Sequence, residues 1–141
     1  MAEHNIIGQK GEQIAVETMR KKGFRVVDTN WKFGHLEMDV IAVNRKEIAF
    51  VEVKTRTSSF GDKRPEEFVD ELKRRRMAAA ANAYIKIHQI ELVPRFDIIG
   101  ISMDPNTYEV KELTHLEDAF LPPQRTIGKR SFSGQDRWKH R

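Results

Sequence analysis

Two neighbouring stretches of the chain, residues 36–43 and 48–55, alternate between two faces in the manner typical of β-strands. In the first stretch, one face collects Glu37, Asp39, Ile41 and Val43, and the other collects Met38, Val40 and Ala42. In the second, one face collects Ile48, Phe50, Glu52 and Lys54, and the other collects Ala49, Val51 and Val53. Only residues 44–47 separate the two stretches, so the pattern predicts an antiparallel hairpin with a tight turn.

The length of the turn sets the register of this hairpin. With Arg45 and Lys46 as the two loop residues, three cross-strand pairs are expected: Val43 with Ile48, Asp39 with Glu52, and Glu37 with Lys54. A slip by one residue would turn the strand over and set the carboxylates against Val51 and Val53. The pattern therefore predicts a charged cluster on one face of the hairpin, with an apolar core continuing that face.

The rest of the chain supplies two helices and three further strands. Gly23 is suited to end the first helix, and Pro65 is suited to the first turn of the second. An apolar stripe along the second helix is expected from Phe68, Leu72, Ala79 and Ala83. The expected elements are a helix over 7–22, strands over 24–30, 36–43 and 48–55, a helix over 65–88, and strands over 95–102 and 108–113. The order α-β-β-β-α-β-β predicts an α/β (α+β) fold with helices packed on a mixed sheet.

Length and charge distribution suggest one folded domain and a basic tail. The 141 residues suit a single domain, which we place at 1–121, and the chain has no cysteine. Residues 122–141 carry six basic side chains against one acidic side chain, among Pro, Ser and Gly. This composition predicts a flexible arm, which either binds phosphate backbones non-specifically or is simply a solvated end. The remainder has a net charge near zero, so it is not a uniformly basic nucleic-acid binder.

No long apolar segment or secretory leader is evident in the sequence. No apolar run approaches the roughly 18–20 residues that a membrane span requires. Residues 1–10 lack the apolar centre of a signal peptide. With no cysteine for a disulfide framework, we expect a cytoplasmic protein.

The charged cluster of the hairpin has the composition of a metal-dependent hydrolytic site. Asp39 and Glu52 are expected to face each other, and facing carboxylates repel unless a proton, a cation or basic groups neutralise them. Mg²⁺ (or Mn²⁺) takes oxygen ligands, lowers the pKa of a bound water and stabilises charge on a phosphoryl oxygen. Lys54, two residues beyond Glu52, would orient that water or steady the developing negative charge.

A purely structural alternative stands beside this interpretation. A Glu-x-Lys pattern on a strand is common, and a solvated strand face with a Glu37–Lys54 ion pair explains it equally well. Two other features have a structural interpretation: Tyr84 has the spacing of a core residue, and Asp97 lies two residues from Arg95, where we expect an ion pair.

Longer blocks of sequence resemble a known family. Residues 50–56 (FVEVKTR), preceded by residues 37–42 (EMDVIA), resemble the signature of the YraN family, a widespread bacterial family of uncharacterised, endonuclease-like proteins. Shorter matches are Gly11-Glu12, Gly23-Phe24 followed by Asn30, Phe60-Gly61, Val69-Asp70 to Lys73, Ala80 to Tyr84, and Arg95-Phe96-Asp97. The resemblance covers roughly residues 8–102 and continues weakly through 115–120.

This resemblance implies a restriction-endonuclease-like core of the PD-(D/E)XK nuclease superfamily, similar to archaeal Holliday junction resolvases. It implies that Asp39 and Glu52 bind the metal and form the catalytic set with Lys54. It also implies that Glu12, from the first helix, completes the metal ligands. One departure is Leu36, which stands where the family usually has Gly before its Glu-x-Asp block.

Three functions remain open from the sequence. The first is a metal-dependent DNA endonuclease, with branched or damaged DNA as a candidate substrate and Arg56 and Lys73 as backbone contacts. The second is a non-catalytic nucleic-acid-binding module that uses the nuclease fold. The third is an interaction or assembly factor, for which a homodimer paired through an edge strand at 108–113 is conceivable.

Overall fold

The computed structural model describes residues 2–61, 67 and 69–121, with side chains from residue 6 onward. Its elements are α1 (Ala2–Lys21), β1 (Arg25–Phe33), β2 (Leu36–Val43), β3 (Glu47–Arg56), α2 (Glu71–His88), β4 (Val93–Met103) and β5 (Val110–Leu116). The predicted order α-β-β-β-α-β-β is confirmed. The predicted flexible arm, residues 122–141, lies outside the described residues. Within the described part of the chain, no helix is long and apolar enough to span a membrane.

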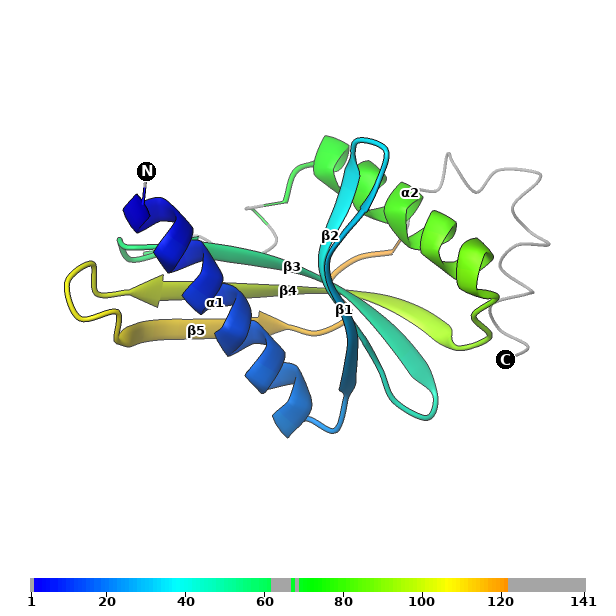
Figure 1. Ribbon diagram of the computed structural model, residues 1–141, viewed down its shortest axis with the longest axis horizontal. Coiled ribbons are helices and arrows are strands. Elements are labelled where there is room, and N and C mark those ends of the chain that lie inside the picture. The colour runs from blue at the N-terminus through cyan, green and yellow to red at the C-terminus, as the bar shows by residue number, and fades with distance from the viewer. Residues whose placement is uncertain (1, 62–66, 68, 122–141) are drawn as a thin grey trace.

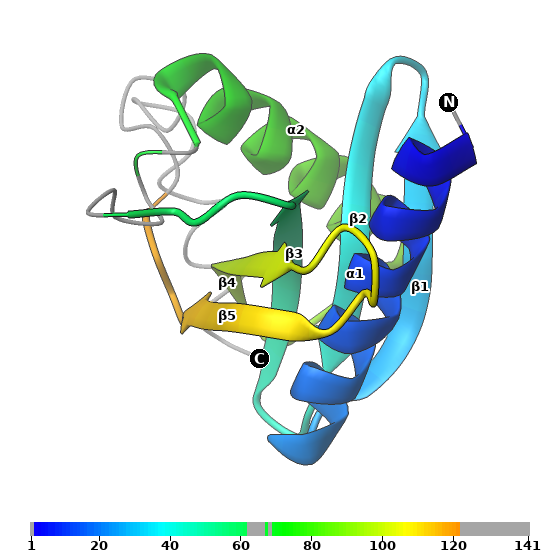
Figure 2. The ribbon, with the colours of Figure 1, turned by 90° about the vertical axis from the view of Figure 1, so that its left-hand side faces the viewer.

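The five strands form one mixed sheet in the order β1-β2-β3-β4-β5. Only β3 and β4 run parallel, and α2 lies in the connection between them. The sheet is strongly twisted, and α1 and α2 lie on opposite faces of it (Figures 1 and 2). Both β1 and β5 are edge strands, and β5 begins and ends later than the predicted 108–113.

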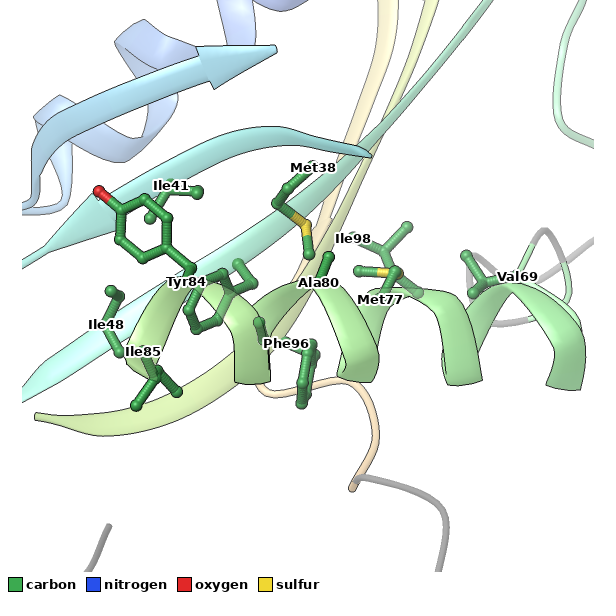
Figure 3. Close-up of a cluster of buried hydrophobic side chains, with 12 residues drawn as sticks. Met38, Ile41, Ile48, Val69, Met77, Ala80, Tyr84, Ile85, Phe96 and Ile98 are labelled. Atoms are coloured by element: carbon green, nitrogen blue, oxygen red, sulfur yellow. The ribbon is translucent and has the colours of Figure 1, made fainter. Parts of the chain in front are cut away.

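Each face of the sheet carries its own hydrophobic core. Under α2, Phe50, Phe96 and Tyr84 pack among the residues drawn in Figure 3. Under α1, Met19 packs with small and branched residues of β2, β3 and β4. The Tyr84 hydroxyl donates a 2.7 Å hydrogen bond to Asp28 of β1, so the predicted core role of Tyr84 is confirmed and α2 is tied to the edge strand.

The predicted start and apolar face of α2 were both wrong. The helix begins after Asp70, whose carboxylate accepts a 2.8 Å hydrogen bond from the Lys73 amide and caps the first turn. Pro65, the predicted start, and Phe68 lie outside the described residues. Leu72 is 53% exposed rather than buried. The buried face is instead made by Met77, Ala80, Ala81, Tyr84 and Ile85.

A close approach between α1 and β3 fixes the first helix on the sheet. The helix starts at Ala2, earlier than predicted, and ends before Gly23, whose φ of +93° favours glycine. Midway along it, Gly11 is buried directly against Thr55 of β3, and a β-carbon at this position would overlap the Thr55 side chain. Glycine is therefore required at position 11 because the helix backbone lies so close to Thr55, and not because its backbone conformation excludes other residues.

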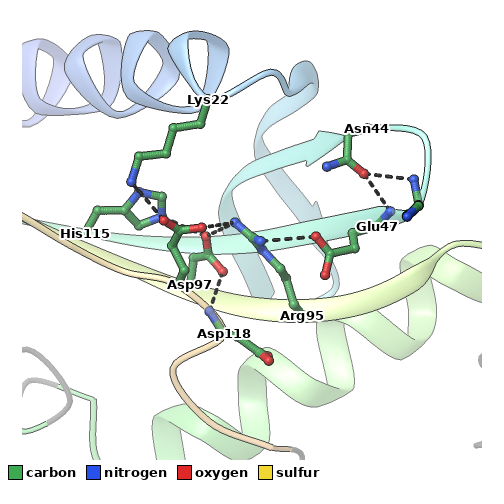
Figure 4. A network of polar contacts seen from close by, with 9 residues as sticks. Lys22, Asn44, Glu47, Arg95, Asp97, His115 and Asp118 are labelled. Atoms are coloured by element: carbon green, nitrogen blue, oxygen red, sulfur yellow. Dashed lines mark hydrogen bonds and ion pairs between the residues drawn. The ribbon is translucent and has the colours of Figure 1, made fainter.

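A polar network joins β4, the end of α1 and the segment after β5 (Figure 4). Asp97 is fully buried and accepts hydrogen bonds from Arg95 (2.9 Å), His115 Nε2 (2.7 Å) and the Asp118 amide (3.0 Å). Lys22 Nζ lies 2.8 Å from His115 Nδ1. Because an ammonium can only donate, Nδ1 accepts and Nε2 carries the hydrogen that Asp97 accepts. The predicted Arg95–Asp97 ion pair is confirmed.

These partners decide the charge of the buried carboxylate. Burial alone would raise the pKa of Asp97, but the hydrogen bonds from His115 and the Asp118 amide, with the charge of Arg95, lower it below its ordinary value. Asp97 therefore stays ionised inside the protein and serves as a structural anchor.

The contact at Gly11 leads to a prediction about stability. Gly11→Ala should lower the free energy of unfolding by about 1–3 kcal/mol, because the new methyl group forces α1 away from β3. Urea denaturation followed by circular dichroism measures this change. Adding Thr55→Ala should recover part of the loss, because it removes most of the overlapping atoms.

Gly8, on the same helix, is the matched control. A β-carbon there meets no atom within 4 Å, so Gly8→Ala should stabilise the protein by up to about 1 kcal/mol through helix propensity. Equal effects of the two substitutions would contradict the close packing of α1 on β3.

Candidate active site

The predicted hairpin forms in the predicted register. Val43 pairs with Ile48, and Arg45 and Lys46 make the two-residue loop. The Asn44 side chain shapes this loop by accepting hydrogen bonds from the amides of Lys46 (2.9 Å) and Glu47 (2.7 Å) (Figure 4). The ladder between β2 and β3 continues to Val40 and Val51 and ends there.

Beyond that last pair the two strands separate, and the Asp39 side chain enters the gap. Asp39 Oδ2 accepts a 2.8 Å hydrogen bond from the Val53 amide of β3. The carboxylate thus takes the place of the β2 carbonyl that would otherwise satisfy this donor. Asp39 and Glu52 are the next positions in the predicted register, but they meet through side chains and not as a ladder pair.

Strand β1 has an unusual backbone conformation opposite Asp39. Asn30 has a φ of +52° and faces the gap at Asp39, between the pairs Thr29–Val40 and Trp31–Met38. The alternation of β2 is broken at this point. Met38 packs on the α2 side with Ile41 (Figure 3). Val40 packs on the α1 side. The prediction that Met38 shares a face with Val40 was wrong, because the alternation of β2 does not continue through Asp39.

Glu52 lies beside Asp39 and beside one lysine of α2. Its Oε1 is 3.5 Å from Lys73 Nζ, and only 14% of its side chain is exposed. Burial, followed by the charge of Asp39, raises the pKa of Glu52 to about 7, and the two carboxyl groups share a hydrogen bond. Burial likewise raises the pKa of Asp39, against the Val53 amide and Lys73, which lower it. The pair therefore shares one proton near neutral pH.

These groups line a cleft of about 610 Å³ between α1, the diverging strands and the start of α2. Its walls are Gly8, Gln9, Glu12, Asn30, Glu37, Asp39, Glu52, Val53, Lys54, Thr55 and Lys73. Glu12 follows Gly11, so the contact of Gly11 with Thr55 brings it to the cleft. Even so, across the described residues no three His, Cys, Asp or Glu side chains come close enough together to hold a metal ion.

The predicted lysine and arginine residues have different surroundings. Lys54 lines the cleft but makes no ion pair among the described residues, and neither does Glu37. The structural alternative of a Glu37–Lys54 ion pair is therefore absent from this part of the chain. The Arg56 guanidinium lies over the Phe60 ring, 5.0 Å from its centroid, and is not among the residues that line the cleft.

The donor chemistry of the cleft fits a hard divalent cation. Two carboxyl groups that share a proton offer a cation the place of that proton, and Asp39 retains Oδ1 when Oδ2 is bonded to Val53. Glu12 is within the same cleft, and its rotation toward Asp39 would supply a third carboxylate. None of the residues that line the cleft is a His, Cys or Met, so among metal ions the oxygen-seeking Mg²⁺ and Mn²⁺ suit it best.

Sequence reasoning missed three lining residues: Gly8, Gln9 and Asn30. Gly8 and Gln9 precede Glu12 by four and three residues, so helical spacing alone would have placed them beside it. Asn30 was noted as a matching position without a role. Its place at the cleft follows from its positive φ, which a strand pattern does not reveal.

Comparison with known proteins identifies relatives over most of the chain. A family model described as "Uncharacterised protein family UPF0102" matches residues 11–101. A UPF0102 protein of Bacteroides thetaiotaomicron is 40% identical over 123 residues, which cover 87% of this chain and 98% of that protein. A UPF0102 protein of Parabacteroides distasonis is 42% identical over 125 residues, covering 89% of this chain and all of that protein. The matched region contains Glu12 and the whole carboxyl pair.

The shared proton leads to a pH-dependent prediction. Because the pKa of Glu52 in the folded protein is about 7 against an ordinary 4.5, the stability carried by its protonated form is complete below pH of about 4.5 and is lost as pH rises through about 7. Glu52→Gln removes this loss. Relative to the wild type, the variant should therefore gain on the order of 1–3 kcal/mol of unfolding free energy between pH 5 and pH 8.

Urea denaturation in a metal-free buffer at both pH values measures this gain. Glu109→Gln, at an exposed glutamate in the β4–β5 connection, is the control and should show no such change. A Glu52→Gln effect that is the same at pH 5 and pH 8 would refute the buried proton.

Proposed function

The chain belongs to the UPF0102 family, and we propose that it is a Mg²⁺-dependent endonuclease that hydrolyses phosphodiester bonds of DNA. One observation carries this proposal: the largely buried carboxyl groups of Asp39 and Glu52 line the same cleft as Lys54 and Lys73, and burial raises the pKa of both carboxyl groups. A structural salt bridge needs one cation for each carboxylate. Here two carboxyl groups have one ion-pair partner among the described residues, Lys73, so ionisation of both would leave a negative charge unbalanced. A bound divalent ion would neutralise that charge.

Each side chain has a distinct task in this mechanism. Asp39 and Glu52 hold the cation, which when bound lowers the pKa of a water and stabilises charge on the phosphoryl oxygens. Lys54 lies two residues beyond Glu52 on the same strand, makes no described ion pair, and orients the attacking water or donates to the developing negative charge. Lys73, whose Nζ lies 3.5 Å from Glu52 Oε1, would be a contact for a substrate phosphate if a cation took its place beside Glu52.

The resemblance to the YraN family supports the same assignment. In a PD-(D/E)XK core the aspartate and the Glu-x-Lys pair come from two adjacent strands, and β2 and β3 carry them here. The fold order is also consistent with such a core. Similarity to Holliday junction resolvases suggests branched DNA as the substrate and gives Glu12 the role of an additional ligand.

A second candidate function is a non-catalytic nucleic-acid-binding module. It is favoured by the absence of a three-carboxylate group among the described residues and by the Lys73–Glu52 ion pair, which partly neutralises the site. The two functions differ in their dependence on metal. Binding by such a module would be sensitive to salt and indifferent to Mg²⁺ and to Asp39→Asn.

The catalytic proposal is tested by separating metal binding from cleavage. Wild-type protein with Mg²⁺ or Mn²⁺ is incubated with linear, branched and single-stranded DNA, and Mn²⁺ binding is measured by calorimetry. Asp39→Asn should abolish Mn²⁺ binding and cleavage together. Lys54→Met should retain Mn²⁺ binding and reduce the cleavage rate by roughly 10²–10³-fold, because it removes charge needed only in the transition state.

Lys86→Met, an exposed lysine on α2, is the matched control and should cleave as the wild type does. Thermal denaturation of each variant shows whether the fold is retained. Absence of cleavage by the wild type on every substrate, together with DNA binding that ignores Mn²⁺, would replace the nuclease by the binding module.

A further inference from the structure

A second cleft lies at the turn between β2 and β3. It has a volume of about 860 Å³ and lies between this turn and the start of β1. Its lining residues are Gly23, Arg25, Val43, Asn44, Arg45 and Lys46. The turn and the last residues of α1, which include Arg20 and Lys21, lie at the same end of the molecule in both views (Figures 1 and 2). We call Arg20, Lys21, Arg25, Arg45 and Lys46 the basic end.

The basic end carries positive charge that the described residues do not neutralise. All five side chains are exposed, and none makes an ion pair within the described part of the chain. Two neighbouring acidic residues are already engaged: Glu47 pairs with Arg95, and Glu117 pairs with Lys22 and Arg95. Three of the five side chains, Arg25, Arg45 and Lys46, line the same cleft, so these positive charges are grouped around one concave surface.

We propose that this cleft binds the phosphate backbone of a nucleic acid, as a second contact remote from the carboxyl pair. The inference rests on the proposed function for the kind of ligand only. Two arginines and one lysine are among the six residues that line a cleft of about 860 Å³, and guanidinium groups bind phosphate oxygens in pairs. The contact carries no sequence preference, because no base edge needs to be reached.

The position of the cleft sets the minimum length of a substrate that uses both sites. Asp39 lies on β2 and Asn44 directly follows its last residue, five residues further on, which at about 3.3 Å per residue separates the two clefts by roughly 17 Å. At 3.4 Å per nucleotide along one strand of a duplex, this span corresponds to about five nucleotides. A fragment of two or three nucleotides can therefore occupy only one cleft at a time.

A membrane surface of anionic lipid is the other polyanion that a basic patch attracts. A bilayer is flat and is met by protruding side chains, whereas these cations line a hollow between two turns. Among the described residues beside them, Val93, whose amide is bonded to the Lys46 carbonyl, is a large exposed apolar side chain (41% exposed). One aliphatic side chain is far less apolar surface than the face by which a protein segment enters a bilayer. The geometry therefore favours a strand of nucleic acid.

The test measures DNA binding in EDTA, so that cleavage plays no part. Fluorescence anisotropy with a 20-nucleotide duplex compares the wild type with Arg25→Gln/Arg45→Gln over a range of salt. The double variant should bind roughly tenfold more weakly at 0.1 M salt. The slope of log affinity against log salt should fall in magnitude by about 1.8, because two phosphate contacts to a duplex are lost.

Arg76→Gln/Lys86→Gln removes the same charge from exposed positions on α2, across the sheet, and should change the affinity less than twofold. Both double variants should keep the wild-type melting temperature, since no described ion pair is removed. Lys46→Gln provides an independent single variant, for which the slope should fall by about half as much. A trinucleotide should bind the wild type more weakly than the 20-nucleotide duplex does, because it can occupy only one cleft at a time.

Several results would overturn the inference. Wild-type affinity in Arg25→Gln/Arg45→Gln, or an equal loss in the α2 control, would show that the cleft makes no specific contact. Displacement of the duplex by millimolar inorganic phosphate would indicate a site for free phosphate. Charge-dependent binding to phosphatidylserine vesicles with unchanged DNA binding would assign the basic end to a membrane. If the wild type cuts no DNA but the EDTA result holds, the nuclease proposal fails and this inference stands.

Discussion

The hydrogen bond from the Val53 amide to the Asp39 carboxylate is the contact on which the candidate site depends. Strands β2 and β3 must separate to leave room for a cleft, and separation would strand a buried amide without a partner. Asp39 satisfies that amide with one oxygen, so the sheet opens at little cost in unpaired donors. The same contact holds its carboxyl group next to Glu52, where burial forces the pair to share a proton. Asp39 thus has two roles: it satisfies a backbone donor of the sheet, and it belongs to the carboxyl pair of the candidate site.

The hairpin of β2 and β3 organises charge at both of its ends. Where the strands part, carboxyl groups gather at the cleft beneath α1 and α2; where they turn, cations gather at the basic end. Between the two, the hairpin is fixed by a core on each face and by its parallel pairing with β4. The distance between the two charged regions is therefore a property of the sheet. Under the two proposals made above, a polyanion would contact the basic end directly and the carboxyl pair only through a bound cation.

Features of the fold and of the candidate site could be predicted from the sequence where they depend on contacts between residues close together in the chain. The period of two and the two-residue loop specify the register from Val43 and Ile48, so the meeting of Asp39 with Glu52 was foreseeable. The side on which Met38 packs was not, because a period of two does not reveal where β2 leaves its ladder with β3 and the alternation breaks. The start of α2 depends on the Asp70 cap, and the prediction placed it at Pro65 instead, which also set the apolar stripe out of phase at Leu72. Glu12 was suggested chiefly by resemblance, since nothing local links it to the hairpin.

The Val53 amide also has a practical consequence, since it is bonded to the side chain that would receive a cation. Any ligand that draws electron density from Asp39 weakens a hydrogen bond that lies inside the sheet. The ¹H and ¹⁵N chemical shifts of the Val53 amide should therefore change when a ligand occupies the site. They can be followed without a substrate and without labelling the ligand. Val53 lies within the part of β3 that pairs with β4. A change at its amide therefore reports on an ordered strand and not on a loop.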